Sequence, residues 1–150
     1  MQKILFVCLG NICRSPSAEA VFAAKAQAAR LPVIVDSAGT GNWHVGEPPY
    51  GPMQRAASAR GYDLSSLRAR QITVLDFEGF DLIIAMDEAN LRDIERLRPS
   101  DSETPVTLMM SYAPQTGERV VPDPYYTRDF DEALDLIEAA ATGLLATLRS

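Results

Sequence analysis

The feature that most constrains the fold is the alternation of short apolar runs with helix-forming segments. Residues 3–8, KILFVC, form a nearly continuous apolar run rich in β-formers, which is typical of a strand buried on both faces. We expect further strands at 33–39 (VIVDSAG), 80–86 (FDLIIAM) and 106–110 (VTLMM). Strands that alternate with helices predict an α/β fold: a parallel sheet with helices on both faces and right-handed crossovers.

The segments between these runs have helix signals. Ser15 is expected to be an N-cap with Pro16 at the first helical position, before a strong helix-forming stretch. Further helices are expected at 51–61, ending at Gly61, and at 87–97, stopped by Pro99. The last helix has an apolar stripe at spacings of three and four, formed by Phe130, Leu134, Ile137, Ala141, Leu144, Leu145 and Leu148.

A segment without expected secondary structure, residues 111–127, precedes the last helix. It contains Pro114, Pro122 and Pro124, and loops of this length inside a compact domain usually have a function. We expect residues 1–150 to form one domain, because this length is typical of one.

Composition limits the class of protein. The chain is 47% hydrophobic and 23% charged, as in ordinary globular proteins, and its net charge of −6 argues against a nucleic-acid surface. The N-terminal apolar run is too short for a secretory signal peptide, and no segment approaches the ~20 apolar residues of a membrane span. We expect a cytoplasmic protein without nucleic-acid or membrane partners, although secretion without a signal peptide stays compatible with the sequence.

The two cysteines, Cys8 and Cys13, lie in one short stretch. A bridge across five residues would constrain little of the chain, so a disulfide framework does not explain them. His44 is the only histidine, which leaves a zinc site poorly supported. We expect neither a metal nor a cofactor.

The stretch VCLGNICRSP at 7–16 lies between the first strand and the first helix, where ligands bind in parallel sheets. Successive N–H groups and the helix dipole there favour an anion, and Gly10 and Asn11 tolerate the positive φ of a tight curl. Arg14 would complete a phosphate site with its planar fork. The expected phosphate-binding residues are Leu9, Gly10, Asn11, Ile12, Cys13 and Arg14.

The same positive field favours the thiolate of Cys8, which becomes a nucleophile directed at phosphorus. Ser15 is expected to donate to the sulfur when a phosphocysteine is hydrolysed. Asp123, between Pro122 and Pro124 in VPDPYY, is the candidate acid for the departing oxygen. A Walker A loop is absent, so kinase or NTPase chemistry is disfavoured.

Taken together, these stretches resemble the low-molecular-weight protein tyrosine phosphatases over essentially the whole chain. The resemblance rests on VCLGNICRSP at 7–16, DSAGTGNWHVGEPP at 36–49, ARQIT at 69–73, DLIIAMDEANL at 81–91 and VPDPYY at 121–126. It implies a single flavodoxin-like domain with a four-stranded sheet in the order 2-1-3-4. It also implies a metal-free phosphatase acting on tyrosine-phosphorylated proteins, a bacterial tyrosine kinase being one candidate.

The resemblance assigns roles to individual residues. Cys8 is the nucleophile, Arg14 binds phosphate and stabilises the transition state, and Asp123 is the general acid and then the general base. Ile12, Trp43 and Tyr125 are expected to form the walls of the substrate pocket.

Two further expectations concern the loop itself. Members of the family support the asparagine matching Asn11 with a serine and a histidine, but Leu67 stands at the histidine position, so we expect Ser37 and Ser15 to support Asn11 alone. Cys13 is the expected redox partner of Cys8, since a bridge between them would protect the oxidised nucleophile.

Other readings of the sequence stay open at this point. An arsenate reductase of this fold is rejected, because it needs cysteines after Cys13. A protein arginine phosphatase of the same fold would carry Thr where Ile12 stands, and a silent phosphotyrosine-binding module would lack turnover. The physiological substrate, the oligomeric state and any phosphorylation of Tyr125 or Tyr126 are not determined by the sequence.

Overall fold

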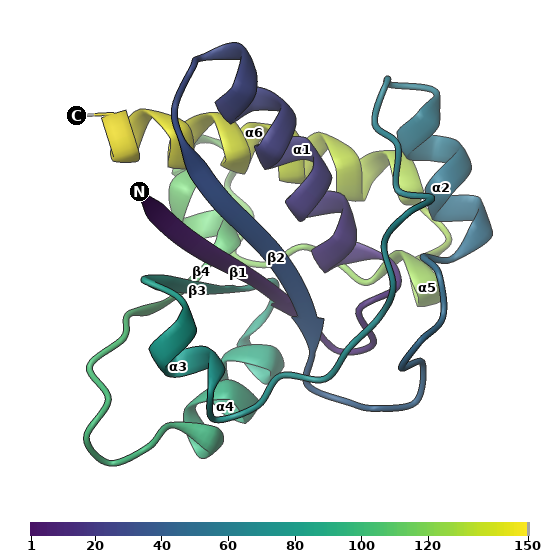
Figure 1. Cartoon of the computed structure of the whole chain (residues 1–150). Helices are drawn as coiled ribbons and strands as arrows, with labels where there is room; N and C mark the ends of the chain where they lie inside the picture. Colours follow the sequence, from purple (N-terminus) through teal and green to yellow (C-terminus); the bar gives the residue numbers. More distant parts are fainter. Residues whose placement is uncertain (150) are drawn as a thin grey trace.

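The computed structural model describes residues 1–149, and its centre is a parallel sheet (Figure 1). The strands are β1 (Gln2–Cys8), β2 (Val33–Gly39), β3 (Leu82–Ala85) and β4 (Val106–Leu108), hydrogen-bonded in the order β2-β1-β3-β4. Every neighbouring pair is parallel. The predicted sheet and its strand order are therefore confirmed.

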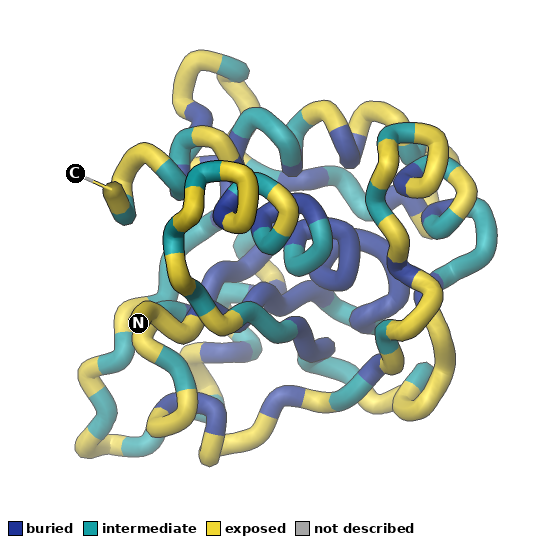
Figure 2. Tube along the Cα trace, turned by 45° about the horizontal axis from the view of Figure 1, so that its top comes forward, coloured by how far each residue is buried: buried dark blue, intermediate teal, exposed yellow. Residues whose placement is uncertain are grey.

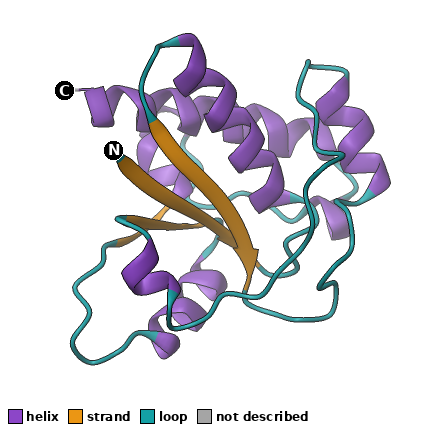
Figure 3. Cartoon of the chain, viewed as in Figure 1, coloured by secondary structure: helices purple, strands orange, loops and turns teal. Residues whose placement is uncertain are grey.

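Helices cover the two faces of this sheet (Figures 1 and 3). On one face lie α1 (Arg14–Ala28) and α6 (Phe130–Arg149), with α2 (Gly51–Ser58) packed beside α6. On the other face lie α3 (Asp76–Gly79) and α4 (Glu88–Leu97). This is the predicted arrangement with helices on both faces.

The side chains of β1 alternate between these two layers. Ile4 and Phe6 belong to the cluster under α1 and α6, whereas Leu5 and Val7 belong to the cluster under α3 and α4. All four are fully inaccessible to solvent, which matches the dark blue centre of Figure 2. Because the strand is buried on both faces, its carboxyl end is held rigidly where the functional loop begins.

The predicted apolar stripe of α6 is confirmed. Its members Leu134, Ile137, Ala141 and Leu144 are buried, and Phe130, Leu145 and Leu148 are partly buried against the same core. The carbonyl oxygen of Tyr112 would lie 1.8 Å from a Cβ atom at Gly143, so a glycine is required where α6 meets the turn η1 (Met109–Tyr112).

Several local predictions differ from the structure. The strand expected at 106–110 ends at Leu108, since the chain turns into η1, and α2 ends at Ser58, with Gly61 at φ +91° beyond it. The segment 111–127 is not structureless: it contains η2 (Pro114–Thr116) and α5 (Pro124–Thr127).

None of the helices within residues 1–149 has the length and hydropathy that crossing a bilayer requires.

Candidate active site

The loop that follows β1 curls around one point at the carboxyl edge of the sheet; we call residues 8–14 the phosphate loop. The carbonyl groups of Leu9 and Ile12 point out of this loop, where they accept hydrogen bonds from the N–H groups of Gly41 and Tyr50 at 2.9 and 2.8 Å. The N–H group of Asn11 points inward and donates to Sγ of Cys8 at 3.3 Å. Carbonyl groups that point out and an N–H group that points in are features of an anion nest.

The two residues expected to need positive φ behave differently. Asn11 takes φ +57°, as predicted, whereas Gly10 does not enter the left-handed region. The prediction for Gly10 is therefore wrong in its reason. A Cβ atom at Gly10 would lie 3.1 Å from Cδ2 of His44, so the glycine allows the His44 ring to approach the loop.

Cys8 is buried in the loop, and two polar groups lie within hydrogen-bond distance of its sulfur. Oγ of Ser15 lies 3.1 Å from Sγ, in addition to the N–H group of Asn11. Helix α1 begins at Arg14 with Cys13 as its N-cap, so the prediction that Ser15 caps the helix is wrong. Its hydroxyl lies within hydrogen-bond distance of the sulfur and accepts from Nδ2 of Asn11 instead.

Asn11 holds the loop in shape through its side chain. Its Nδ2 donates to Oγ of Ser15 at 2.8 Å and to Oγ of Ser37 at 3.0 Å, so both expected contacts are present. A contact that the sequence did not indicate completes the set: the backbone N–H of Arg70 donates to Oδ1 of Asn11 at 3.0 Å. Leu67 packs against the hydrophobic core.

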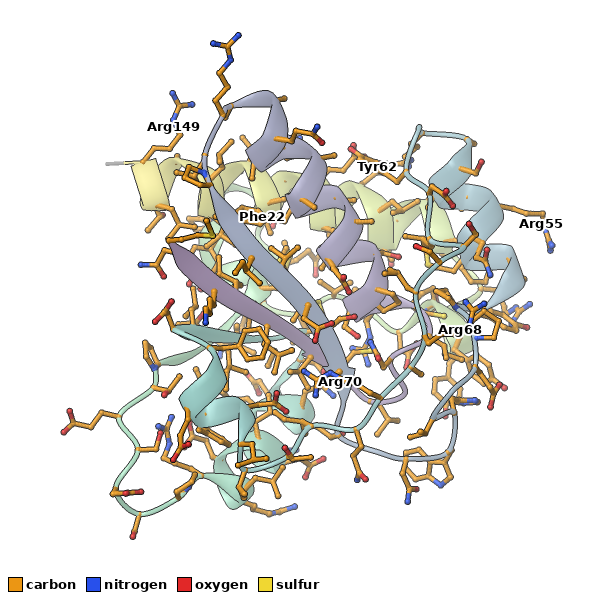
Figure 4. The ribbon with its side chains drawn as sticks, in the orientation of Figure 1. Phe22, Arg55, Tyr62, Arg68, Arg70 and Arg149 are labelled. Carbon is orange, nitrogen blue, oxygen red and sulfur yellow. The ribbon has the colours of Figure 1, made fainter. Side chains whose placement is uncertain are left out.

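Arg70, labelled in Figure 4, is itself fixed by two carboxylates. Its guanidinium donates to both oxygens of Asp76, at 3.0 and 3.1 Å, and to Oδ2 of Asp36 at 3.1 Å. Burial would lower its pKa, but these carboxylates raise it above the ordinary value. The charged side chain thus locks the backbone N–H that Asn11 uses.

Behind Ser37 lies a partly buried carboxyl group. The hydroxyl of Ser37 donates to Oε1 of Glu19 at 2.7 Å. Burial raises the pKa of Glu19, and the hydrogen bond from Ser37 opposes this rise. A chain of hydrogen bonds therefore runs from Glu19 through Ser37, Asn11 and Ser15 to the sulfur of Cys8.

Arg14 is almost fully buried and makes three polar contacts. Its Nη1 donates to Oδ2 of Asp87 at 2.6 Å and to the carbonyl of Val121 at 3.0 Å, and its Nη2 donates to Oδ2 of Asp123 at 3.3 Å. Burial alone would lower the pKa of Arg14, but the charge of Cys8 and the two carboxylates raise it. Its buried Nε has no hydrogen-bond partner within residues 1–149, which leaves a donor for an oxyanion.

Asp87 is a site residue that the sequence reasoning missed. Its Oδ1 accepts from the N–H of Asn90 at 2.8 Å as the N-cap of α4, while Oδ2 holds Arg14. The available signal was its place directly after a strand and before a helix, in the quoted DLIIAMDEANL. Its partner is distant in sequence and could not be found from that pattern.

A pocket of about 270 Å³ opens above the phosphate loop. The predicted walls Ile12, Trp43 and Tyr125 all line it, and so does Asp123. His44 and Tyr126 are further lining residues. The Trp43 ring packs over Gly41, where a Cβ atom would collide with it at 1.9 Å. The glycine therefore lets the indole, which is largely exposed to solvent, lie on the loop.

Cys13 also lines the pocket, and both cysteines are free thiols. Burial raises the pKa of Cys13 strongly, and the charges of Cys8 and Asp123 raise it further, whereas Arg14 and Arg128 act in the opposite direction. Cys13 is therefore a neutral thiol beside the nucleophile candidate.

With this geometry established, comparisons with known proteins identify the family. A sequence model of "Low molecular weight phosphotyrosine protein phosphatase" matches residues 3–150. The chain belongs to this family. The low molecular weight protein-tyrosine-phosphatase of Streptomyces coelicolor is 46% identical over 154 residues, covering 98% of this chain and 93% of that protein.

Solved structures of similar proteins agree with the low-molecular-weight phosphatase fold. YfkJ from Bacillus subtilis is 38% identical, with a TM-score of 0.94, covering 99% of this chain and 95% of that one. A Drosophila arginine phosphatase is 32% identical, with a TM-score of 0.92, covering 100% of this chain and 99% of that one.

Proposed function

We propose that this protein is a protein tyrosine phosphatase that acts through a phosphocysteine on Cys8. The observation that carries the proposal is that Cys8 and Asp123 line one pocket, while Arg14 donates to Asp123 and keeps an Nε without a partner within residues 1–149. A nucleophile, an oxyanion donor and an acid within one small site are the groups that phosphoryl transfer to a thiolate requires.

In the first step, the Cys8 thiolate attacks phosphorus, so a sulfur–phosphorus bond forms while the bond from phosphorus to the tyrosine oxygen breaks. Arg14 and the N–H groups of the phosphate loop stabilise the equatorial oxygens. Asp123 gives its proton to the departing phenolate oxygen.

In the second step, Asp123 takes a proton from water as the water oxygen attacks phosphorus. Phosphate leaves and the sulfur departs as a thiolate. Ser15, 3.1 Å from Sγ, donates to this sulfur as negative charge returns to it. The same hydroxyl supports the first step by keeping the thiolate ready.

The pocket walls support phosphotyrosine as the substrate. Cys8 is buried below Trp43 and Tyr125, so a long aromatic side chain reaches the sulfur and stacks on the walls, whereas phosphoserine is too short. We expect kcat/KM for phosphotyrosine peptides to exceed that for phosphoserine peptides at least ~100-fold, about 2.7 kcal/mol of transition-state binding.

The second candidate substrate is phosphoarginine, because the chain is similar to a Drosophila arginine phosphatase. The side chain of Ile12 lines the pocket and favours an aromatic ring over a guanidinium group. Kinetics on matched phosphotyrosine, phosphoserine and phosphoarginine peptides test the proposal, with Ile12→Thr as the matched variant. Equal rates on phosphotyrosine and phosphoarginine in the wild type would contradict it.

We also propose that Cys13 protects the nucleophile from irreversible oxidation. Peroxide oxidises the Cys8 thiolate to a sulfenic acid with release of hydroxide, and the Cys13 thiol then displaces that hydroxyl as water to form a disulfide. After peroxide and then dithiothreitol, wild type should regain most activity and Cys13→Ser far less. Equal recovery would leave Cys13 as a packing residue.

The substrates that we propose are tyrosine-phosphorylated proteins of the cytoplasm, with a bacterial tyrosine kinase as one candidate. Cys8→Ser keeps the anion nest but has no thiolate, so it should retain such proteins without releasing phosphate. A pull-down with Cys8→Ser from the source cells, compared with the double variant Cys8→Ser/Arg14→Ala, identifies them.

A further inference from the structure

Arg128 lies next to the pocket residue Tyr125 and is held by aromatic rings. It follows α5 directly, and its guanidinium carbon lies 5.2 Å from the ring centre of Tyr50 and 5.4 Å from that of Phe130. Its Nη1 also donates to the hydroxyl of Tyr50 at 2.9 Å. Two rings and a hydrogen bond order an otherwise exposed cation, so little side-chain entropy remains to be lost on binding.

This cation is close to the substrate wall. The ring of Tyr50 packs on that of Tyr125 at 5.1 Å between centres, and Nη1 of Arg128 lies 3.5 Å from the carbonyl oxygen of Tyr125. Its charge also acts on Cys13 in the phosphate loop, where it opposes the raised pKa of that thiol. Arg128 therefore lies beside the pocket wall, and we call its place the rim.

The arginines with structural roles are paired with acids: Arg60 with Asp131, Asp135 and Glu138, and Arg70 with Asp36 and Asp76. Arg128 has no carboxylate within ion-pair distance in the part of the chain that the structure describes. Its guanidinium thus has the capacity to bind an acid from outside.

The backbone at Arg128 is strained. It takes φ +64° at the end of α5, a position that favours glycine or asparagine. Side chains kept in such conformations cluster at ligand sites and switches. The strained backbone therefore favours a functional role for the Arg128 side chain.

We propose that Arg128 determines substrate specificity by binding a carboxylate beside the phosphotyrosine, so that the enzyme prefers acidic phosphotyrosine segments. Adjacent residues of an extended peptide lie ~3.4 Å apart along the chain, which places the neighbours of the phosphotyrosine over the rim. Because the protein has a net charge of −6, an acidic segment is repelled by the surface as a whole and needs a local cation.

This inference rests on the proposed phosphotyrosine activity, and its test compares phosphotyrosine peptides that differ only in the residues flanking the phosphotyrosine, as Glu, Gln or Lys. The readout is the ratio of kcat/KM for the Glu peptide to that for the Lys peptide. Wild type should give a ratio of roughly 5 or more, the scale of exposed ion pairs. Arg128→Gln should bring the ratio close to one, Arg128→Glu should invert it, and Arg128→Lys should keep part of it.

Arg55→Glu is the matched control, because it changes the charge by the same amount as Arg128→Glu. Arg55 belongs to α2, and its side chain points outward into solvent (Figure 4). Arg55→Glu should keep the wild-type ratio. Raising the salt concentration should reduce the ratio in wild type but not in Arg128→Gln. A ratio near one in wild type, or an unchanged ratio in both Arg128→Gln and Arg128→Glu, would overturn the proposal.

The proposed function and this specificity fail in distinguishable ways. If wild type hydrolysed none of the phosphotyrosine peptides, the proposed function would be lost. Binding of the same labelled peptides to Cys8→Ser and to Cys8→Ser/Arg128→Glu would still test the role of Arg128. Equal affinity of both proteins for the Glu peptide would then overturn that role.

Discussion

Nη1 of Arg14 donates to Oδ2 of Asp87 at 2.6 Å, which ties the phosphate loop to the first turn of α4. The other oxygen of the same carboxylate caps that helix through the N–H of Asn90. Asp87 therefore has two tasks. It caps α4 on one face of the sheet, and it orients Arg14, the first residue of α1 on the other face. The guanidinium is aimed before any substrate arrives, which is the preorganisation that charge stabilisation needs.

Asp87→Asn should separate these two tasks. Asparagine caps helices about as well as aspartate, but it removes the charge that holds Arg14. We expect kcat/KM for an aryl phosphate to fall about 10-fold, since the guanidinium is less firmly oriented. Asp93→Asn on the same helix removes a surface pair with Arg96 and should have no effect. An unchanged kcat/KM in Asp87→Asn would show that Val121 and Asp123 are sufficient to position Arg14.

Asp123→Asn should remove the general acid and leave α5 intact. The side chain at 123 also accepts from the N–H of Tyr125 at 3.1 Å, a contact that asparagine keeps. With a poor leaving group such as phenol, kcat should fall by ~10²- to 10⁴-fold, and with p-nitrophenol by less. The basic limb of the pH profile of kcat/KM should disappear. Asp129→Asn is the matched control, and survival of the basic limb in Asp123→Asn would assign the proton to another group.

Ser15→Ala should slow breakdown of the phosphocysteine more than its formation. Without the hydroxyl 3.1 Å from Sγ, the departing sulfur keeps only the N–H group of Asn11 as a donor. We therefore expect kcat to fall about 10-fold and a burst of released phenol to appear in stopped flow. Ser17→Ala is the control, because Ser17 is equally buried but its hydroxyl donates to the Cys13 carbonyl. A lower kcat without a burst would place the effect on the first step instead.

The parts of the fold that follow from local pattern were predictable from the sequence. The buried β1, the apolar stripe of α6 and the loop from Cys8 to Arg14 each have a signal within a few neighbouring residues. Asp123 was also found, because prolines on both sides mark it.

What the sequence did not predict depends on partners far along the chain. Ser15 has the local signature of an N-cap, but its tertiary contacts with Cys8 and Asn11 decide its role. The backbone N–H of Arg70 supports Asn11, and Asp87 holds Arg14. Neither pairing leaves a periodic pattern in the sequence. The same holds for Arg128, whose ring partners belong to different elements.

Glu19→Gln should change how the stability of the protein depends on pH. Burial raises the pKa of Glu19 in the folded state, so the folded protein binds this proton more tightly than the unfolded chain does. Stability from this group is present at acidic pH and is lost as the pH rises through the folded-state value. Glutamine accepts the same hydrogen bond from Ser37 without a charge.

Urea unfolding at several pH values measures this effect. The free energy of unfolding of Glu19→Gln, relative to wild type, should therefore increase between pH 4 and pH 7. Glu78→Gln, at an exposed position, should show no such increase. A constant difference between Glu19→Gln and wild type across this range would mean that the buried carboxyl group does not titrate as described.

Trapping the phosphoryl group tests directly whether Cys8 carries it. Asp123→Asn is mixed with a phosphotyrosine peptide, quenched in acid within its first turnover, digested and analysed by mass spectrometry. We predict one phosphoryl group per chain on Cys8, absent from Cys8→Ser and lost on incubation before quenching. Phosphate on another residue, or turnover by Cys8→Ser within tenfold of wild type, would rule out Cys8 as the nucleophile.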